Sequence, residues 1–414
     1  MEEWCNKKIK EICIVGRGRV INQNEIKEKP GIYPVYSSQS QNKGEMGKID
    51  SYDFNGEYVT WTTDGAYAGT VFYRNGKFNC TNVCGTLKAK DEDSLNMNFL
   101  AYLLSTNAKK HVSYLGNPKL MNGVMSEIDL VLPRLRFEQS KIAEILTKAD
   151  EAISNTETLI LKYQRIKIGL LQDLLTMGID EKGNIRSKKT HKFVVKNGIE
   201  VPKEWDVELL DNIVSEVLDF KANGSFETLT ENVKYYYEQN YARLIRLTDL
   251  RNGLKNEGVY IDQKGFQFLK KTRLVEGDIL IACVGEYTGF VCQMPKIPYQ
   301  STIAPNMFVV RFKSNIINSF AARYMTSSQF QNQVSIVSTS SATKLLNNPN
   351  LRSLKLVIPN KEEQILIANR IDSVDLVIND YTESLKKLNT IKTGLMQDLL
   401  SGKVRVKINE EVRT

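Results

Sequence analysis

The sequence predicts an α/β (α+β) protein with two mixed globular heads and a pair of long antiparallel coiled-coil helices, related by a pseudo-two-fold internal repeat. Three observations lead to this prediction. Two distant segments share nearly the same sequence. Apolar residues recur every three or four positions over two stretches of about 40 residues. Short apolar runs broken by turn residues fill much of the remaining chain.

The duplication is clearest at the ends of the two periodic stretches. Residues 166–175 read IKIGLLQDLL and residues 391–400 read IKTGLMQDLL, so eight of ten positions agree at an offset of 225. Fainter matches also occur in each copy. They pair Glu3-Trp4 with Glu204-Trp205, GAYAG at 65–69 with GEYTG at 285–289, Lys119-Leu120 with Lys344-Leu345, and LVLP at 130–133 with LVIP at 356–359.

The two periodic stretches are predicted to be long helices. Neither contains an internal proline, and each follows one, Pro133 or Pro359, where a strand is expected to end. Such a helix would extend about 60 Å. A lone apolar seam usually packs on the protein's own core, whereas two seams of matching length and similar sequence favour pairing with each other.

The domain boundaries follow from these elements. The heads contain short alternating runs such as YVTW at 58–61, which are typical of strands, and helices are expected at 97–110 and 316–333. The connector between the copies is polar, basic and glycine-containing, so it is expected to be exposed. The predicted divisions are head one at 1–135, a helix at 136–176, the connector at 177–202, head two at 203–360, a helix at 361–401 and a tail at 402–414.

Antiparallel pairing of the helices is expected from the connector. Parallel helices would crowd both heads at one end and require the 26-residue connector to return the full helix length. Antiparallel helices would place one head at each end, separated by about one turn of DNA or somewhat more. Two unlike heads related by a dyad suit a bipartite and asymmetric DNA site.

Candidate DNA contacts are hydrogen-bonding and cationic side chains in predicted loops. Arginine can pair with guanine, asparagine and glutamine can pair with adenine, and both arginine and lysine can meet the phosphate backbone, as Arg17, Arg19, Lys43, Arg74 and Lys77 are expected to do. The same segments have simpler interpretations as solvated loops, tight turns with a packed tyrosine, or an exposed charged face. The candidates in head one are Arg17, Arg19, Ser38, Gln39, Gln41, Asn42, Lys43, Thr63, Tyr67, Arg74, Lys77 and Lys119. Those in head two are Arg243, Arg246, Thr248, Asp249, Arg251, Tyr287, Ser338, Ser340, Ser341, Thr343 and Lys344.

Composition limits the other function classes. The net charge of +8 permits a polyanionic partner without requiring one. Six scattered cysteines and two distant histidines predict free thiols rather than a metal site. The charged N-terminus and the lack of a long apolar run predict a cytoplasmic protein. Without a methyltransferase motif, a P-loop or a glycine-rich cofactor loop, neither catalysis nor a cofactor is expected.

The order and duplication of these motifs resemble type I restriction-modification specificity subunits over nearly the whole chain. The resemblance rests on the repeated I-K-x-G-L-x-Q-D-L-L ending, the preceding L-P or I-P followed by glutamine, the Glu-Trp openings, GDIL at 277–280 and YSSQ at 36–39. It implies that the heads are target recognition domains, each reading half of a split site in double-stranded DNA. It also implies that the helices set the spacing and dock two methylation subunits, with restriction subunits joining the complex.

The repeated helix ends are candidates for docking two identical methylation subunits, although they could equally form the core of the helical pair. The candidates are Gly169, Gln172, Asp173, Gly394, Gln397 and Asp398. Two other functions remain open: a structural spacer that joins two protein partners without touching DNA, and a DNA enzyme with an unrecognised site.

Overall fold

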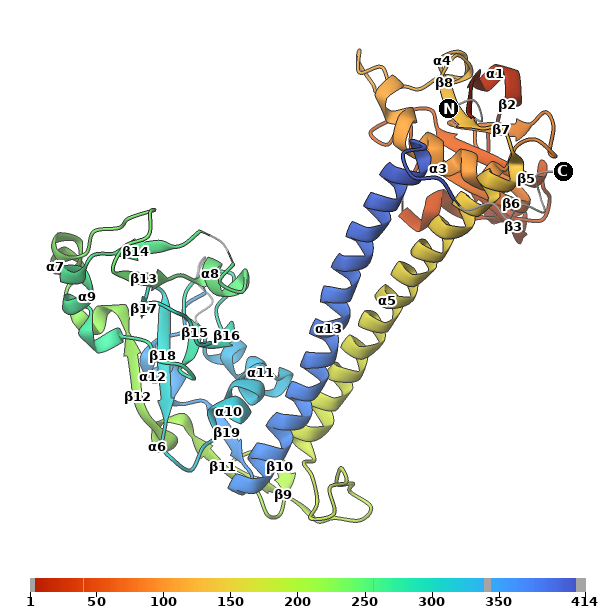
Figure 1. Ribbon diagram of the computed structural model, residues 1–414. Coiled ribbons are helices and arrows are strands. Elements are labelled where there is room, and N and C mark those ends of the chain that lie inside the picture. Colours follow the sequence, from red (N-terminus) through yellow and green to blue (C-terminus); the bar gives the residue numbers. More distant parts are fainter. Residues whose placement is uncertain (1–3, 40, 256, 339–343, 407–414) are drawn as a thin grey trace. The chain divides into compact units, whose positions relative to one another are not determined.

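The chain divides into two units, and each contains one head and part of both long helices (Figure 1). The computed structural model describes residues 4–39, 41–255, 257–338 and 344–406. Unit 1 comprises Met1–Leu159 and Tyr381–Thr414, and unit 2 comprises Ile160–Asp380. The long helices are α5 (Arg136–Thr176) and α13 (Lys361–Leu400). The mixed α/β class and the two long helices confirm the predicted fold class.

Head one is built on a six-stranded sheet in the order β2-β7-β5-β6-β3-β4, in which only β3 and β6 pair in parallel. Helix α3 packs on β5 and β6 through a buried apolar face that includes Phe99 and Leu103. The strands are β1 (Trp4–Lys8), β2 (Cys13–Arg17), β3 (Pro30–Tyr36), β4 (Glu45–Ile49), β5 (Phe54–Thr62), β6 (Val71–Cys80), β7 (Cys84–Ala89) and β8 (Asp129–Pro133). The helices are α1 (Ile9–Ile12), α2 (Gln23–Glu28), η1 (Gln41–Gly44), α3 (Met97–Asn107), η2 (Ala108–His111) and α4 (Asn122–Ser126).

Head two contains a four-stranded sheet, β12-β18-β15-β16, and a three-stranded sheet, β14-β13-β17. Its strands, with the hairpin β9–β10 before it, are β9 (Phe193–Lys196), β10 (Ile199–Pro202), β11 (Asp206–Leu209), β12 (Val214–Asp219), β13 (Ala242–Ile245), β14 (Val259–Ile261), β15 (Ile279–Ala282), β16 (Val291–Gln293), β17 (Gln300–Ile303), β18 (Met307–Phe312) and β19 (Lys355–Ile358). Its helices are α6 (Leu210–Ile213), η3 (Phe220–Asn223), α7 (Phe226–Asn232), α8 (Leu247–Arg251), α9 (Gln263–Phe268), η4 (Lys270–Thr272), α10 (Asn318–Met325), α11 (Ser328–Val337) and α12 (Asn348–Arg352).

The helix expected at 316–333 is interrupted. Helix α10 ends at Met325 and α11 begins at Ser328, and the side chain of Ser327 accepts a hydrogen bond from the backbone N–H of Phe330. A serine in this position caps a new helix rather than continuing the old one. The helix expected at 97–110 is α3, followed by the 3₁₀ turn η2.

The internal repeat is visible in the two-stranded β-ribbon that precedes each long helix. In unit 1, β1 pairs antiparallel with β8, and α5 follows β8. In unit 2, β11 pairs antiparallel with β19, and α13 follows β19. One backbone hydrogen bond recurs beside each ribbon, from Ile9 N to Ile128 O and from Leu210 N to Leu354 O.

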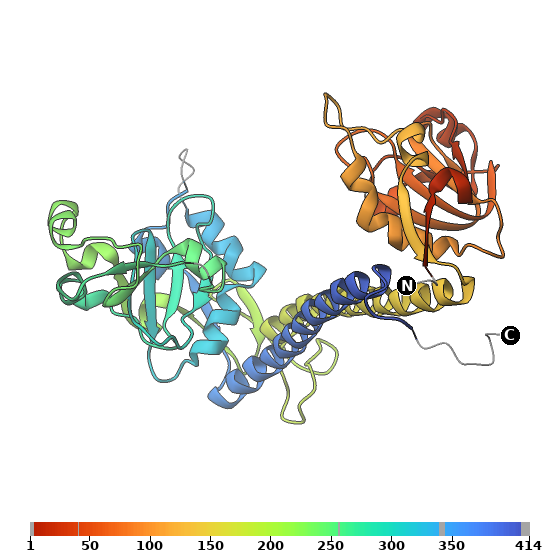
Figure 2. The same ribbon diagram turned by 45° about the horizontal axis from the view of Figure 1, so that its top comes forward.

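Helices α5 and α13 run antiparallel within each unit, side by side in both views (Figures 1 and 2). In unit 1, Leu399 and Leu400 at the end of α13 share the core with Ile142 and Leu146 near the start of α5. In unit 2, Leu174 and Leu175 at the end of α5 share the core with residues from the start of α13, which are Ile367, Ala368 and Ile371. The antiparallel pairing predicted from the connector is therefore found in each unit.

The connector is more structured than its composition indicated. It contains the hairpin β9–β10, and Ile179 and Val201 are buried in the core of unit 2. Arg186 is also buried, against Glu363 near the start of α13. The expectation of an exposed connector was wrong for these residues, because their partners lie far away in the sequence. Among the described residues, no helix is both long and apolar enough to cross a membrane.

Candidate nucleic-acid interface

The repeated G-x-Y-x-G segments form the same turn in both heads. Gly65 and Gly285 have φ of +93° and +91°, a region of backbone conformation that favours glycine. The N–H of Ala68 donates to Gly65 O, and the N–H of Thr288 donates to Gly285 O in the same way. The turn presents the exposed side chain of Tyr67 in head one and that of Tyr287 in head two.

A second segment of each head is bonded to this turn. In head one, Gly65 N donates to Pro118 O at 3.0 Å and Leu120 N donates to Thr63 O at 2.9 Å. In head two, the corresponding bonds run from Gly285 N to Lys344 O at 2.9 Å and from Leu346 N to Cys283 O at 2.8 Å. We call this arrangement of turn and bonded segment the loop junction. The pairing of Lys119 with Lys344 inferred from the sequence was off by one residue, because Lys344 occupies the place of Pro118.

The loop junction of head one gathers four candidates. Arg17 donates from Nη2 to Thr63 Oγ1 at 3.0 Å and to Asp64 Oδ2 at 3.4 Å. Lys119 Nζ lies 3.9 Å from the other oxygen of Asp64, and Tyr67 projects from the turn. Thr63 is fully buried, so it positions Arg17 and is not itself available to a ligand. Arg17, Tyr67 and Lys119 remain accessible at this junction.

The loop junction of head two includes Arg251, one of the candidates at 243–251 that we call the arginine cluster (Arg243, Arg246, Thr248, Asp249 and Arg251). The Arg251 guanidinium lies 3.7 Å over the ring of Tyr287, and Lys344 is exposed on the segment bonded to the turn. Arg246, the N-cap residue of α8, pairs with Asp249 at 2.8 Å between Nη2 and Oδ1. Hydrogen bonding to the Asp249 carboxylate raises the pKa of Arg246, so the guanidinium of Arg246 keeps its positive charge. Thr248 is exposed at the start of the same short helix.

Two members of the predicted arginine cluster are buried rather than accessible. Asp249 is fully buried, and its carboxylate also accepts the backbone N–H of Arg246. Arg243 is buried within β13 and donates from Nη1 to Leu254 O at 3.3 Å. Direct DNA contact by these two residues does not fit the structure, because a buried side chain cannot reach a groove.

The polar segment at 38–43 of head one forms a separate cluster. Arg74 is buried, stacks 3.5 Å from the ring centre of Tyr36 and donates to Lys43 O at 2.5 Å. Burial lowers the pKa of this guanidinium from its ordinary value. Asn42 and Lys43 have φ of +49° and +51°, a left-handed conformation that is unusual for residues with a side chain. Arg74 therefore holds the loop in place and does not project into solvent.

The remaining candidates in this part of head one differ in accessibility. Gln39 is exposed and its amide donates to Glu45 O, Ser38 is half-buried, and Asn42 and Lys43 are exposed. The side chain of Gln41 lies outside what the structure describes. Lys77 is exposed, 4.5 Å over the ring of Tyr52.

Arg19 and Ser338 are engaged within the protein. Arg19 pairs with Glu25 at 2.8 Å and with Asp53 at 3.0 Å, and the hydrogen bond to Glu25 raises its pKa. Two carboxylates therefore offset its charge, which makes a phosphate contact unfavourable. Ser338 donates to Val334 O at 2.7 Å at the end of α11. Ser340, Ser341 and Thr343 lie outside the described residues.

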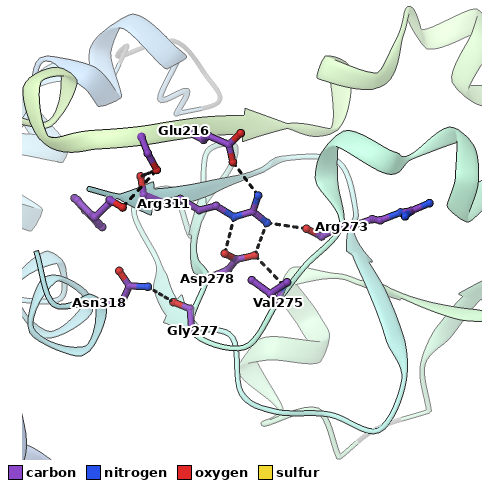
Figure 3. Close-up of polar contacts among 9 residues, drawn as sticks. Glu216, Arg273, Val275, Gly277, Asp278, Arg311 and Asn318 are labelled. Carbon is purple, nitrogen blue, oxygen red and sulfur yellow. Dashed lines mark hydrogen bonds and ion pairs between the residues drawn. The ribbon is translucent and has the colours of Figure 1, made fainter. Parts of the chain in front are cut away.

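Head two also contains an ion pair between the buried Asp278 of the GDIL segment and the partly exposed Arg311 (Figure 3). Arg311 on β18 donates from Nε and Nη2 to the two carboxylate oxygens of Asp278, at 2.8 and 2.9 Å. Its other contacts are Glu216 Oε2 and Arg273 O, both at 2.8 Å. Hydrogen bonding to Asp278 raises the pKa of Arg311. This network joins β12, β18 and the entry to β15, so the aspartate of GDIL is structural.

The distribution of charge supports a polyanion as the ligand of both heads. Residues 287–361 contain no Asp or Glu and eight Lys or Arg, and residues 94–126 contain no Asp or Glu and three Lys. Several of the basic residues are paired with acids elsewhere, such as Arg311 and Arg352. Both acid-free segments contain the segment bonded to the G-x-Y-x-G turn. A phosphate backbone would therefore meet little electrostatic repulsion from either segment.

Sequence reasoning missed four exposed aromatic or apolar side chains near these segments. Tyr235 and Tyr237 are the exposed members of a run of three tyrosines before β13, and Tyr114 and Leu115 lie at the tip of a loop before Pro118. The YYY run at 235–237, beside Lys234, was the available signal in head two. Nothing in the local pattern of head one distinguished an exposed Tyr-Leu pair from a buried one.

The six helix positions considered for partner docking are not buried. Gly169, Gln172 and Gln397 are exposed, and Asp173, Gly394 and Asp398 are partly exposed. The core at these helix ends is formed instead by Leu174, Leu175, Leu399 and Leu400. The helix ends therefore contribute to the two cores through these leucines, as the alternative expected, whereas the six positions themselves are not among the core residues. Within the described ranges, no cluster of three or more His, Cys, Asp or Glu side chains is arranged to hold a metal ion.

Comparison with known proteins gives a consistent picture. Residues 1–163 and 202–393 match the family described as "Type I restriction modification DNA specificity domain". A Mycoplasma pneumoniae protein named as the N-terminus of a type I specificity subunit is 55% identical over 140 residues, which cover 34% of this chain and 74% of that protein. The specificity subunit of the type I restriction enzyme MpnII, from the same organism, is 50% identical over 139 residues, or 33% of this chain and 41% of that subunit.

Solved structures show the same fold at low sequence identity. The S subunit of a type I restriction-modification system from M. genitalium superposes with a TM-score of 0.62 at 14% identity, covering 98% of this chain and 97% of that chain. A chain from a structure on the assembly and conformational transition of the type I R-M system gives a TM-score of 0.55 at 13% identity, with coverages of 97% and 98%.

Proposed function

Because this chain belongs to the family of type I restriction-modification DNA specificity domains, we propose that its heads read the two halves of one bipartite, asymmetric site in double-stranded DNA. The observation that carries this proposal is the loop junction. The backbone bonds are the same in both heads, but the side chains differ: Arg17 and Lys119 in one, Arg251 and Lys344 in the other. One backbone frame with two sets of side chains suits two different half-sites.

The DNA contacts are assigned to the accessible side chains of each head. Arginine at a groove edge reads bases, whereas lysine positions the phosphates. Thr63, Arg74, Arg243 and Asp249 are assigned positioning roles because they are buried. The proposed contacts are Arg17, Gln39, Asn42, Lys43, Tyr67, Lys77 and Lys119 in head one, and Tyr235, Tyr237, Arg246, Thr248, Arg251, Tyr287 and Lys344 in head two.

The helices would set the distance between the half-sites and dock two methylation subunits, which restriction subunits join. The repeated, unburied pairs Gln172 with Gln397 and Gly169 with Gly394 suit two identical partners. A Cβ at either glycine would meet nothing within 4 Å, so a partner could approach the helix backbone closely. In this proposal, the chain supplies sequence recognition and its partners supply the catalysis.

Methylation mapping tests the proposed function. DNA from cells with and without the gene would be sequenced by a single-molecule method that detects methylated bases. A bipartite motif should be present with the gene and absent without it. Arg251→Ala should relax one half of the motif and leave the other unchanged, and Arg17→Ala should do the reverse. No change in any motif on deletion would refute the proposal.

A spacer that never touches DNA is the alternative function. It predicts no footprint, whereas a reading subunit in complex with its methylation subunits should protect two separated patches of duplex with salt-dependent affinity. The docking assignment has its own test. Gln172→Arg and Gln397→Arg should each weaken the binding of one methylation subunit, measured by the mass of the purified complex, and Glu157→Gln on the exposed face of α5 should not.

A further inference from the structure

We propose that Tyr114 and Leu115, at the tip of a loop in head one, form an apolar wedge that enters the DNA between base pairs of the half-site. This inference rests on the proposed function and deepens it. The loop, residues 113–119, is closed by two backbone hydrogen bonds between Ser113 and Lys119, both at 2.9 Å. Figure 1 shows it as an orange loop projecting from head one, in the part of the chain between α3 and α4.

The tip exposes apolar surface that the rest of the head does not cover. Leu115 is 95% exposed and Tyr114 is 71% exposed, and Leu115 is the most exposed large apolar side chain among the described residues. Gly116 adopts φ +79°, which turns the chain tightly after the tip. A closed loop with an apolar pair at its end is suited to insertion.

The base of the loop is held by hydrogen bonds and packing and belongs to the proposed DNA face. The loop junction bonds Pro118 and Leu120 to the turn that carries Tyr67. On the other side, Val112 is buried against Gly69, where an added Cβ would lie 2.9 Å from Val112 Cγ2. The tip is therefore anchored to the same loop junction as Tyr67 and Arg17.

Charge around the loop favours DNA over a protein partner. The acid-free segment 94–126 brings Lys109, Lys110 and His111 to the start of the loop and Lys119 to its end. Asp64, at the base, is already matched by Arg17 and Lys119. Apolar side chains flanked by cations are the combination that DNA-bending proteins use, because cations hold the phosphates while the apolar group separates two base pairs.

Substitution of the tip tests the wedge. The complex with methylation subunits would be prepared with Tyr114→Ser, with Leu115→Ser and with both. Ile32→Ser, at a 75% exposed apolar residue of β3, is the matched control. The duplex would carry the motif found by methylation mapping, with 2-aminopurine at half-site positions other than the methylated adenine. Affinity would be measured across a range of salt concentrations.

We expect the double variant to bind the target about 10- to 100-fold more weakly, as for loss of base stacking. The slope of log K against log salt should not change, because no charge is removed. The double variant should also lose the rise in 2-aminopurine fluorescence on binding. The Ile32→Ser control should keep both the affinity and the fluorescence rise of the unaltered complex. Unchanged affinity with an unchanged fluorescence rise would overturn the wedge. So would loss of a methylation subunit from the variant complex, which would identify the tip as a protein contact. If the unaltered complex binds no bipartite duplex, the proposed function itself fails.

Discussion

Glu363, near the start of α13, forms a two-point ion pair with Arg186, which lies in the connector 177 residues away. Arg186 Nη2 donates to Glu363 Oε2 at 3.0 Å, Nη1 donates to Oε1, and both side chains are at most 7% exposed. The same relationship recurs in unit 1, where Arg405 donates to both oxygens of Glu138 at 2.6 and 2.7 Å. In each unit, the segment that follows one long helix is thus fastened to the start of the other.

The buried pair in unit 2 should be costly to break. Arg186→Gln leaves the Glu363 carboxylate buried without its cation, which costs about 3–5 kcal/mol in the free energy of unfolding. Arg405→Gln should cost less, because Arg405 is 35% exposed and water can replace it. Chemical denaturation measures both. Lys188→Gln, which breaks an exposed pair with Glu200, is the control and should change stability by less than about 1 kcal/mol. Equal losses for Arg186→Gln and Lys188→Gln would show that burial does not govern this contact.

Two buried glutamines should show matching effects in the two units. Gln139 accepts the N–H of Asn96 at 2.8 Å and donates to Pro133 O and Ser94 O, and it is 1% exposed. Gln364 makes the same three bonds with Ile317 N, Pro359 O and Asn315 O.

Gln139→Ala and Gln364→Ala should each cost about 2–4 kcal/mol, because three backbone groups lose their partner. Amide hydrogen exchange should accelerate at Asn96 in the first variant and at Ile317 in the second. Gln263→Ala, at an exposed position of α9, should leave stability nearly unchanged. A large effect of only one of the two substitutions would argue against equivalent roles.

The features that sequence reasoning predicted are those that repeat or that follow a local period. The helices α5 and α13 were visible because their apolar residues recur every three or four positions. The turn at GAYAG and GEYTG was visible because glycine at φ near +90° is a local requirement. Which residues of the two heads are equivalent was not predictable, because the offset between the copies changes along the chain. Gly65 and Gly285 are 220 residues apart, whereas Pro118 and Lys344 are 226 apart.

Burial of individual polar residues could not be predicted, because it depends on partners that are distant in the sequence. Arg186 was expected to be exposed in the connector, but it is buried against Glu363. Arg74 looked like a phosphate ligand, but it stacks on Tyr36 and holds Lys43. In the opposite sense, Leu115 is apolar and yet almost fully exposed. In all these cases, composition described the side chain correctly and tertiary contacts decided its role.

The stacked arginine of head two should not tolerate lysine. Arg251 lies 3.7 Å over the Tyr287 ring, a contact that uses the planar guanidinium. Arg251→Lys keeps the charge but loses the stack and the two-point hydrogen bonding to guanine, so discrimination at one base pair should fall by about 1–3 kcal/mol. Lys344→Arg is the control at the same junction and should preserve specificity. Binding to single-base variants of the mapped motif provides the measurement, and equal specificity of Arg251→Lys and the unaltered chain would exclude base reading by Arg251.

The Cys13 thiol should lower stability at alkaline pH. Burial raises the pKa of Cys13 from 9.0 to about 12, so the unfolded chain releases this proton at a lower pH than the folded chain. Stability is unaffected below pH 9 and falls as the pH rises from 9 towards 12, by about 1.4 kcal/mol at pH 10. Denaturation of Cys13→Ala at several pH values should lack this component. Alkylation of native protein at pH 8 should spare Cys13, and rapid labelling there would contradict the pKa shift.

Equal insertions into both helices should lengthen the gap between the half-sites. Seven residues add about 10.5 Å to an α-helix, which corresponds to about three base pairs of DNA. The insertions would be made after Leu159 in α5 and after Asp380 in α13, where the two units meet along the chain, and each would repeat the preceding heptad so that the apolar seam continues. Methylation mapping should then find both half-motifs unchanged and the spacer longer by about three. An insertion in one helix alone should abolish methylation instead, because it would break the register of the antiparallel pair. A motif with its original gap in the double-insertion strain would show that the helices do not measure the distance.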